Sequence, residues 1–128
     1  MKSTLIAVIL LFLNTAFAAG EKNEDGSFKL SPKSLRTMGI KFHKLKDHGP
    51  WLIPSSSLVK IKFTQGVYRK IEEDITFVIV NVMKTEGASV LISSEDLEPM
   101  DEVAIEGVHF LRLTEADLNS STVDSCAH

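Results

Sequence analysis

The stretch that decides the fold runs from Trp51 to Leu113 and opens with WLIPSSSLV at residues 51–59. It closes with LEPMDEVAIEG at residues 97–107, followed by VHFLRL at residues 108–113. Short apolar runs alternate between these ends with polar turns at Thr64–Gly66, Glu72–Asp74 and Lys84–Gly87. Short strands separated by such turns are typical of a small antiparallel β domain.

Two strands are expected to differ in how they are covered. Leu58–Phe63 places Val59, Ile61 and Phe63 on one face and two lysines on the other, as in a half-buried strand. Ile75–Met83 is apolar on both faces, so we expect a central strand covered on both sides, with Met83 in the core. The other expected strands are Phe28–Leu30, Ile40–Leu45, Val67–Ile71, Ala88–Ser93, Glu102–Ile105 and Val108–Leu113.

One short helix is expected between Ser31 and Gly39. Ser31 can cap the free amides of the first turn, Pro32 needs no donor there, and Gly39 can adopt the left-handed conformation that ends a helix. The predicted fold class is therefore mainly β, a small antiparallel β-roll or open barrel with one short helix. We expect Ile40–Leu45 to pair with the C-terminal strands and Leu97 to plug one end of the core.

The N-terminus has the pattern of a secretory signal peptide. Lys2 precedes the apolar run Leu5–Leu13, and Ala16–Ala18 forms a small-x-small cleavage site. The run is about half of the roughly 20 residues that a membrane-spanning helix needs, so we expect cleavage after Ala18 and a periplasmic location. The expected organisation is a signal peptide (1–18), a flexible arm (19–27), a β domain (28–118) and a disordered tail (119–128).

Charge is distributed unevenly along the sequence. Residues 19–70 carry 11 Lys or Arg and 4 Asp or Glu, whereas residues 71–128 carry 2 and 13. One explanation is that basic and acidic strands pair with each other on folding. The other is that a basic face meets anionic lipid headgroups or an acidic patch on a partner. The net charge of −3 argues against nucleic acid as the partner.

The two ends of residues 51–113 resemble the C-terminal part of the periplasmic adaptor subunits, or membrane fusion proteins, of efflux pumps of the resistance-nodulation-division (RND) type. In that family a strand leads into a Pro-Ser-x-(Ala/Ser)-Leu/Val turn, and Gly-Leu-x-Pro-Gly-Asp-x-Val-Val-x-x-Gly follows two or three strands later. Pro54–Leu58 and Leu97–Gly107 take these places here, and Met100 stands where the family has Gly. FKLSPKSLRTMGI, at residues 28–40, is also similar to the start of heavy-metal efflux adaptors.

The resemblance implies a membrane-proximal domain alone. Only Lys46–Pro50 stands where those adaptors carry a helical hairpin, a lipoyl-like domain and a β-barrel. The implied function is that of an adaptor-like accessory protein of an efflux transporter, closest to heavy-metal systems, that acts by docking. The implied partners are the inner-membrane pump, a full-length adaptor and, peripherally, the inner membrane. The residues implied near such contacts are Pro54, Ser55, Ser56, Leu97, Pro99, Met100 and Asp101.

No catalytic motif is evident in the sequence. Pro54–Ser57 offers hydroxyl groups but no local base, and it is better explained as a turn that caps the next strand. Acidic neighbours such as Glu72 and Glu73 stand in predicted turns, and adjacent strand residues point to opposite faces. We therefore expect no enzymatic activity.

The alternative function is a periplasmic metal-binding chaperone for Cu(I) or Zn. Cys126 and His128 place a thiolate and an imidazole close together, and both suit these metals. His43 and His48 lie five residues apart and could supply further ligands. A two-ligand tail is incomplete and must be ordered to close on a metal, so the leading hypothesis includes no cofactor. Because Cys126 is the only cysteine, an intramolecular disulfide is excluded.

Overall fold

The computed structural model describes residues 21–22 and 26–127, and it describes the side chains of residues 26–119. The expected signal peptide, residues 1–18, lies outside the described residues, as does much of the expected arm. Within that arm, Glu21–Lys22 forms strand β1, which pairs with β2 (Phe28–Lys29). None of the helices in the described part of the chain is long and apolar enough to cross a membrane.

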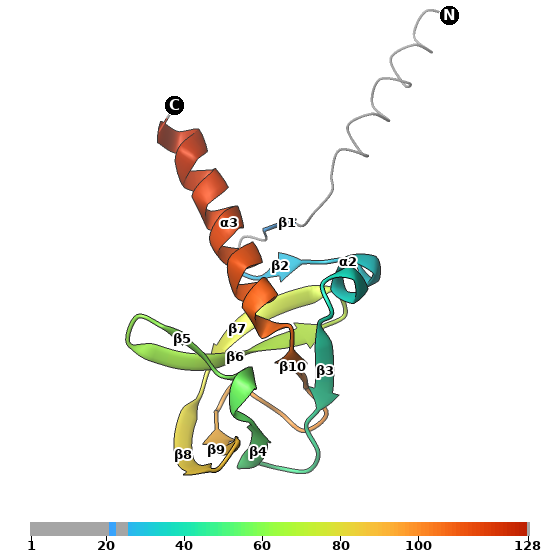
Figure 1. The fold of residues 1–128 in the computed structure, drawn as a ribbon, viewed down its shortest axis with the longest axis vertical. Helices are drawn as coiled ribbons and strands as arrows, with labels where there is room; N and C mark the ends of the chain where they lie inside the picture. Colours follow the sequence, from blue (N-terminus) through green and yellow to red (C-terminus); the bar gives the residue numbers. More distant parts are fainter. Residues whose placement is uncertain (1–20, 23–25, 128) are drawn as a thin grey trace, which may run out of the picture.

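The described residues form two antiparallel sheets and no closed barrel, and the expected mainly β fold class is confirmed (Figure 1). The larger sheet contains, in order, β1, β2, β7 (Asp74–Ile79), β6 (Thr64–Ile71), β10 (Glu102–Glu106) and β3 (Lys41–Lys44), and β5 (Val59–Ile61) pairs with β6. The smaller sheet contains, in order, β4 (Trp51–Pro54), β9 (Ser89–Ser93) and β8 (Asn81–Glu86).

The segment from Ser31 to Lys44 follows the sequence pattern. The expected helix is α2 (Pro32–Thr37), where the Ser31 Oγ accepts a hydrogen bond from the Ser34 N–H at 3.1 Å. Gly39 follows it at φ +70°, a backbone conformation that glycine adopts without strain. The expected pairing of Ile40–Leu45 with a C-terminal strand is confirmed, because β3 pairs antiparallel with β10.

Ion pairs join the basic half of the chain to the acidic half. The four pairs that do so are Lys29–Asp74 at 3.5 Å, Lys41–Glu106 at 3.8 Å, Arg69–Asp101 at 3.7 Å and Lys70–Glu102 at 3.9 Å. Each pair crosses between neighbouring strands or from a strand to the loop before β10. The explanation that basic and acidic strands neutralise each other is therefore confirmed for these residues.

The prediction of a strand at Val108–Leu113 is wrong, because these residues begin helix α3 (Val108–Ala127). Gly107, at φ +73°, turns the chain out of β10. Val108 and Leu111, three residues apart, are buried against the larger sheet, while Phe110 and Leu113 are exposed. A spacing of three residues is typical of a helix. The segment is too short for its sequence alone to distinguish a helix from a strand. The helix also continues through residues 119–127, where a disordered tail was expected.

The expected central strand Ile75–Met83 is also wrong, because the chain changes sheet within it. β7 ends at Ile79, the Val80 N–H donates a hydrogen bond to the Gln65 carbonyl at 2.9 Å, and β8 begins at Asn81 in the smaller sheet. Every residue of β8 is exposed, and the Met83 side chain is 57% exposed instead of buried. The apolar run is thus shared between two sheets, and only its first part supplies core.

Two clusters of buried side chains form the core. The first joins the two sheets, and Leu97 closes it from a loop as expected; its members are Leu45, Trp51, Ile53, Val67, Val78, Val80, Val90, Ile92, Leu97 and Val103. The second lies between the larger sheet and helices α2 and α3; its members are Phe28, Leu30, Ile40, Val59, Tyr68, Ile75, Ala104, Val108 and Leu111.

Tyr68 connects α3 to the larger sheet. Its ring is fully buried, and its hydroxyl donates a hydrogen bond to the Glu115 Oε1 at 2.6 Å. Burial, followed by the hydrogen bond and the negative charge of Glu115, raises the pKa of Tyr68 well above its ordinary value of 10.0, although Arg112 opposes the shift. The native state therefore keeps this proton at a pH where the unfolded chain has lost it.

This shift predicts a loss of stability at alkaline pH. Because the native state binds the proton more tightly, the contribution of Tyr68 is fully present below its unfolded pKa of 10.0 and is lost as the pH rises above it. The expected slope is about 1.4 kcal/mol per pH unit in the free energy of unfolding. In urea unfolding across this range, the pH dependence of the native protein should be steeper by this slope than that of Tyr68→Phe. Parallel curves for the two proteins would contradict the prediction.

Candidate functional site

The smaller sheet has one packed face and one largely exposed face. Ile53 on β4 and Val90 and Ile92 on β9 point into the first core cluster. Successive strand residues point to opposite sides, so Leu52 and its cross-strand partner Leu91 lie on the other side of the sheet. We call this side the open sheet face; its residues are Leu52, Pro54, Asn81, Lys84, Glu86, Ser89, Leu91 and Ser93.

Apolar side chains occupy part of the open sheet face. Leu52 is 54% exposed and stands opposite the half-buried Leu91. The register skips Met83, because Val82 pairs with Ile92 and Lys84 with Leu91, so Met83 is the extra residue of a β-bulge. The exposed face of an antiparallel sheet is ordinarily polar. Exposed apolar groups gathered on it indicate a binding surface.

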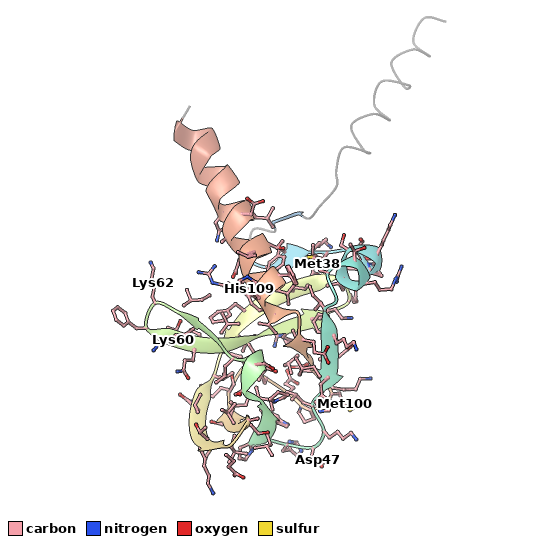
Figure 2. The ribbon with its side chains drawn as sticks, viewed as in Figure 1. Met38, Asp47, Lys60, Lys62, Met100 and His109 are labelled. Atoms are coloured by element: carbon pink, nitrogen blue, oxygen red, sulfur yellow. The ribbon has the colours of Figure 1, made fainter. Side chains whose placement is uncertain are left out.

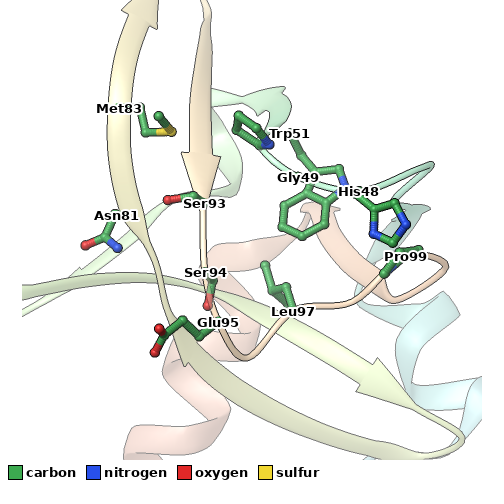
Figure 3. A pocket seen from close by; sticks show the side chains of 11 residues that line it. His48, Gly49, Trp51, Asn81, Met83, Ser93, Ser94, Glu95, Leu97 and Pro99 are labelled. Atoms are coloured by element: carbon green, nitrogen blue, oxygen red, sulfur yellow. The ribbon is translucent and has the colours of Figure 1, made fainter.

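A cleft with a volume of about 400 Å³ opens at one end of the open sheet face. Asn81, Met83 and Ser93 line it from the sheet, and Trp51, the loop 48–50 and the loop residues Ser94, Glu95, Leu97 and Pro99 complete its wall. Figure 3 shows Asn81 and Met83 on one side of the cleft and Trp51, His48 and Pro99 on the other. Its mixed apolar and polar lining is typical of a site that binds a side chain or a small group.

The Trp51 side chain supports one wall of this cleft. Its Nε1 donates a hydrogen bond to the Asp47 carbonyl at 3.2 Å. Its ring lies so close to Gly49 that a Cβ added there would be 2.8 Å from the ring. The chain can therefore fold back over the indole only with glycine at position 49, and this brings His48 to the rim of the cleft.

A loop, residues 94–101, forms another part of the wall, and hydrogen bonds hold this loop in place. The Ser94 Oγ donates to the Ile79 carbonyl at 2.9 Å and accepts from the Asp96 N–H at 3.1 Å. The Arg69 Nη1 donates to the Asp96 carbonyl at 2.6 Å. The Asp101 carboxylate accepts from the Glu98 N–H at 2.8 Å. Two of these contacts fix the loop to the larger sheet and two lie within the loop, so the wall is formed before any partner arrives.

The structure brings together only some of the contact residues that the resemblance implied. Leu97 and Pro99 line the cleft, and Pro54 lies on the open sheet face. Ser55 and Ser56 lie instead in the 3₁₀ turn η1 (Ser55–Ser57), which packs against β10. The Ser56 Oγ donates a long hydrogen bond of 3.4 Å to a carbonyl of β10.

Met100 and Asp101 have structural roles at the end of the loop. Asp101 is half-buried and paired with Arg69, so its carboxylate holds the loop. Met100 is 61% exposed at φ +77°, and its N–H donates to the Leu45 carbonyl at 2.7 Å. Positive φ is strained for any residue with a Cβ and easy for glycine. Met100 therefore holds a backbone conformation that glycine would adopt without strain.

The candidate metal ligands do not form a cluster in the described part of the chain. His43 is exposed on β3, whereas His48 lines the cleft. His128 lies outside the described residues, and Cys126 lies outside those whose side chains are described. Among the side chains that are described, no group of three His, Cys, Asp or Glu residues could hold a metal ion.

Sequence reasoning missed Leu52, Leu91 and Met83 as surface residues. The sequence did contain a signal for the exposure of Leu52, because Trp51–Pro54 has no polar residue on either side of the strand. A strand that is apolar on both faces at the edge of a small sheet must expose one of them.

No protein family matches this chain, and no curated protein or solved structure matches it either. The geometry of the open sheet face and its cleft therefore carries the functional argument.

Proposed function

We propose that this protein is an adaptor-like accessory protein of an efflux transporter and that it docks on its partner through the open sheet face. The observation that carries the proposal is the exposed Leu52 opposite Leu91, on a face that leads into the cleft. Burying a leucine-sized side chain contributes about 1.5–3 kcal/mol. A sheet face that displays such groups without covering them is better explained by a partner than by solvent.

The composition of the face fits an interface. Lys84 and Glu86 lie on β8, the edge strand beside the apolar residues. Their side chains form an exposed ion pair at 3.7 Å. Protein interfaces commonly combine an apolar centre with a polar rim that remains in contact with water. Leu52 and Leu91 on the open sheet face, with the neighbouring bulge residue Met83, would supply the centre, and the two charged residues would supply the rim.

The choice of an efflux system as the partner rests on the resemblance of residues 51–113 to the adaptor subunits. Two features of the structure support that resemblance. Leu97 and Pro99, from the segment that resembles the second adaptor motif, line the cleft beside the open sheet face. Met100 adopts the positive φ that suits the glycine of that motif. The partner is accordingly an inner-membrane pump or a full-length adaptor.

Leu52→Asp is expected to weaken this docking at least about tenfold, because a charge on the apolar centre must be desolvated on binding. The matched control is Leu113→Asp, since Leu113 on α3 is 51% exposed and Leu52 is 54% exposed. Tagged variants are recovered from detergent-solubilised cell envelope, and the co-purifying proteins are identified by mass spectrometry.

The native protein and Leu113→Asp should both recover an efflux pump or a full-length adaptor, and Leu52→Asp should not. Recovery of neither protein by the native chain would overturn the efflux assignment. Equal recovery by Leu52→Asp and the control would show that docking uses another surface.

A further inference from the structure

A two-stranded hairpin projects from the larger sheet. In the described part of the chain, β5 pairs with β6 alone, from Val59 opposite Gly66 to Ile61 opposite Thr64. β6 pairs with β7 only from Gly66 onward. Residues 59–65 therefore extend past the end of β7 (Figure 1). We call them the hairpin arm; its two strands pair with each other along their inner edges.

The tip of the hairpin arm carries an aromatic residue directly after two lysines, Lys60 and Lys62. Sequence alternation predicted that Phe63 is buried, but it lies in the turn, where its side chain is 98% exposed. Lys62 turns the chain there at φ +56°, which ends the alternation early. Lys60 and Lys62 are both exposed on the arm (Figure 2). Neither lysine takes part in the ion pairs found among the described side chains.

Apolar surface lies near the tip, and no acidic residue is close to it in the sequence. The chain contains no Asp or Glu from Val59 to Ile71. A hollow of about 600 Å³ separates the arm from β8, and Lys60, Phe63, Ile79 and Val82 are among its lining residues. Ile79 and Val82 are both exposed there. Phe63 therefore stands at the edge of a hollow whose lining includes other exposed apolar residues.

We propose that the hairpin arm docks on an anionic lipid surface, with Phe63 inserted among the headgroups and acyl chains and Lys60 and Lys62 at the phosphates. Aromatic side chains favour the membrane interface, and each nearby lysine is attracted by anionic lipid. Only the Phe63 side chain has to leave water, so the backbone groups on the open edges of the arm stay at the hydrated level of the headgroups. The proposal rests on the arm and not on the open sheet face, so the two can fail separately.

A lipid surface fits the tip better than an acidic protein segment does. Residues that dominate protein interfaces sit in packed pockets and are ringed by other contacts that exclude water. Phe63 stands clear of its neighbours at the end of a narrow arm, so a protein partner would find little surface around it. A bilayer needs no such surrounding surface, because it closes around an inserted side chain.

The test is co-sedimentation with vesicles of phosphatidylglycerol and phosphatidylethanolamine, with phosphatidylcholine vesicles as the neutral reference. The protein is used as the expressing cell processes it, and its N-terminus is sequenced, because an uncleaved Leu5–Leu13 run would itself bind lipid. Phe63→Ala is expected to weaken binding about tenfold. Lys60→Gln with Lys62→Gln is expected to weaken it about fivefold per lysine, and added salt should do the same.

Matched controls separate the arm from general effects of charge and hydrophobicity. Lys33→Gln with Lys46→Gln removes two other exposed lysines, and Leu113→Ala shortens another exposed apolar side chain. Neither control should change vesicle binding, and circular dichroism should show every variant folded. Absence of binding to the anionic vesicles, or equal losses in arm and control variants, would overturn the proposal. Capture of an acidic protein without vesicle binding would overturn it too.

A tryptophan at the tip reports insertion directly. Phe63→Trp keeps an aromatic ring at position 63 and should bind the anionic vesicles as the native protein does. Its fluorescence should be quenched by lipids brominated on their acyl chains beyond the quenching seen for the buried Trp51 of the native protein. Binding without any additional quenching would mean that the arm does not insert, and the proposal would be wrong.

Discussion

Tyr68→Ala is expected to destabilise the protein by about 3–5 kcal/mol, the usual cost of removing a large buried aromatic side chain. The Tyr68 ring packs edge-on against Phe28 and Phe77, with centroids 6.2 Å and 5.5 Å away, and its hydroxyl reaches Glu115. The substitution therefore opens a cavity in the second core cluster and removes the link between β6 and α3. For a domain of this size, that loss is a large share of the total stability.

Chemical denaturation measures this effect, and Tyr68→Phe is the matched control. Phenylalanine keeps the ring and loses only the hydrogen bond to Glu115, so its expected cost is about 1–2 kcal/mol. The difference between the two variants gives the contribution of the ring. A cost below about 1 kcal/mol for Tyr68→Ala would mean that α3 and the larger sheet do not pack as described.

Gly66→Ala is expected to destabilise the protein by about 3 kcal/mol, at the upper end of the usual overpacking cost. A Cβ at position 66 would lie 2.3 Å from the Val78 carbonyl oxygen and 2.6 Å from the Phe77 ring. The carbonyl belongs to the backbone of β7, which pairs with β6 from this residue onward. The clash can be relieved only by separating the two strands at the base of the hairpin arm.

The control for this substitution is Gln65→Ala, one residue earlier on the same strand. It keeps the backbone carbonyl that accepts the Val80 N–H, so the free energy of unfolding should change by no more than about 0.5 kcal/mol. Both values follow from the denaturation midpoints, provided that the slope of the free energy of unfolding against denaturant concentration is the same in every variant. Equal midpoints for Gly66→Ala and Gln65→Ala would contradict the close packing of β6 on β7.

Local signals predicted the elements whose causes are local. The cap at Ser31, the stop at Gly39 and the pairing of basic with acidic strands all follow from neighbouring residues or from charge. The passage of the chain from β7 to β8 has a different origin. Val80 leaves the larger sheet where the Gln65 carbonyl accepts its N–H, and no pattern within Ile75–Met83 encodes a contact with a residue so far away in the sequence.

The same limit applied to the helix after Gly107. The apolar residues at 108, 110, 111 and 113 fit a strand or a helix over six residues, and the decision depends on Tyr68 and the sheet beneath them. Tertiary contacts of this kind override weak local preferences.

The candidate site was predicted in part. The loop residues Leu97 and Pro99 were expected near a partner and do line the cleft. The apolar residues Leu52 and Leu91 were not expected there, because their exposure depends on which strand neighbours β9 and on which face meets the core. The pairing and register of the strands decide which neighbour β9 has and which face is buried. The sequence of one strand does not specify them.

The most direct test of the docking account places a photo-crosslinking amino acid at position 52, on the open sheet face, and at position 113, on α3, in separate variants. Irradiation of intact cells and mass spectrometry then identify what each position touches. Position 52 is predicted to crosslink to an inner-membrane efflux pump or a full-length adaptor, and position 113 is predicted not to do so. Crosslinks to such a partner from position 113 alone, or from neither position, would contradict the account.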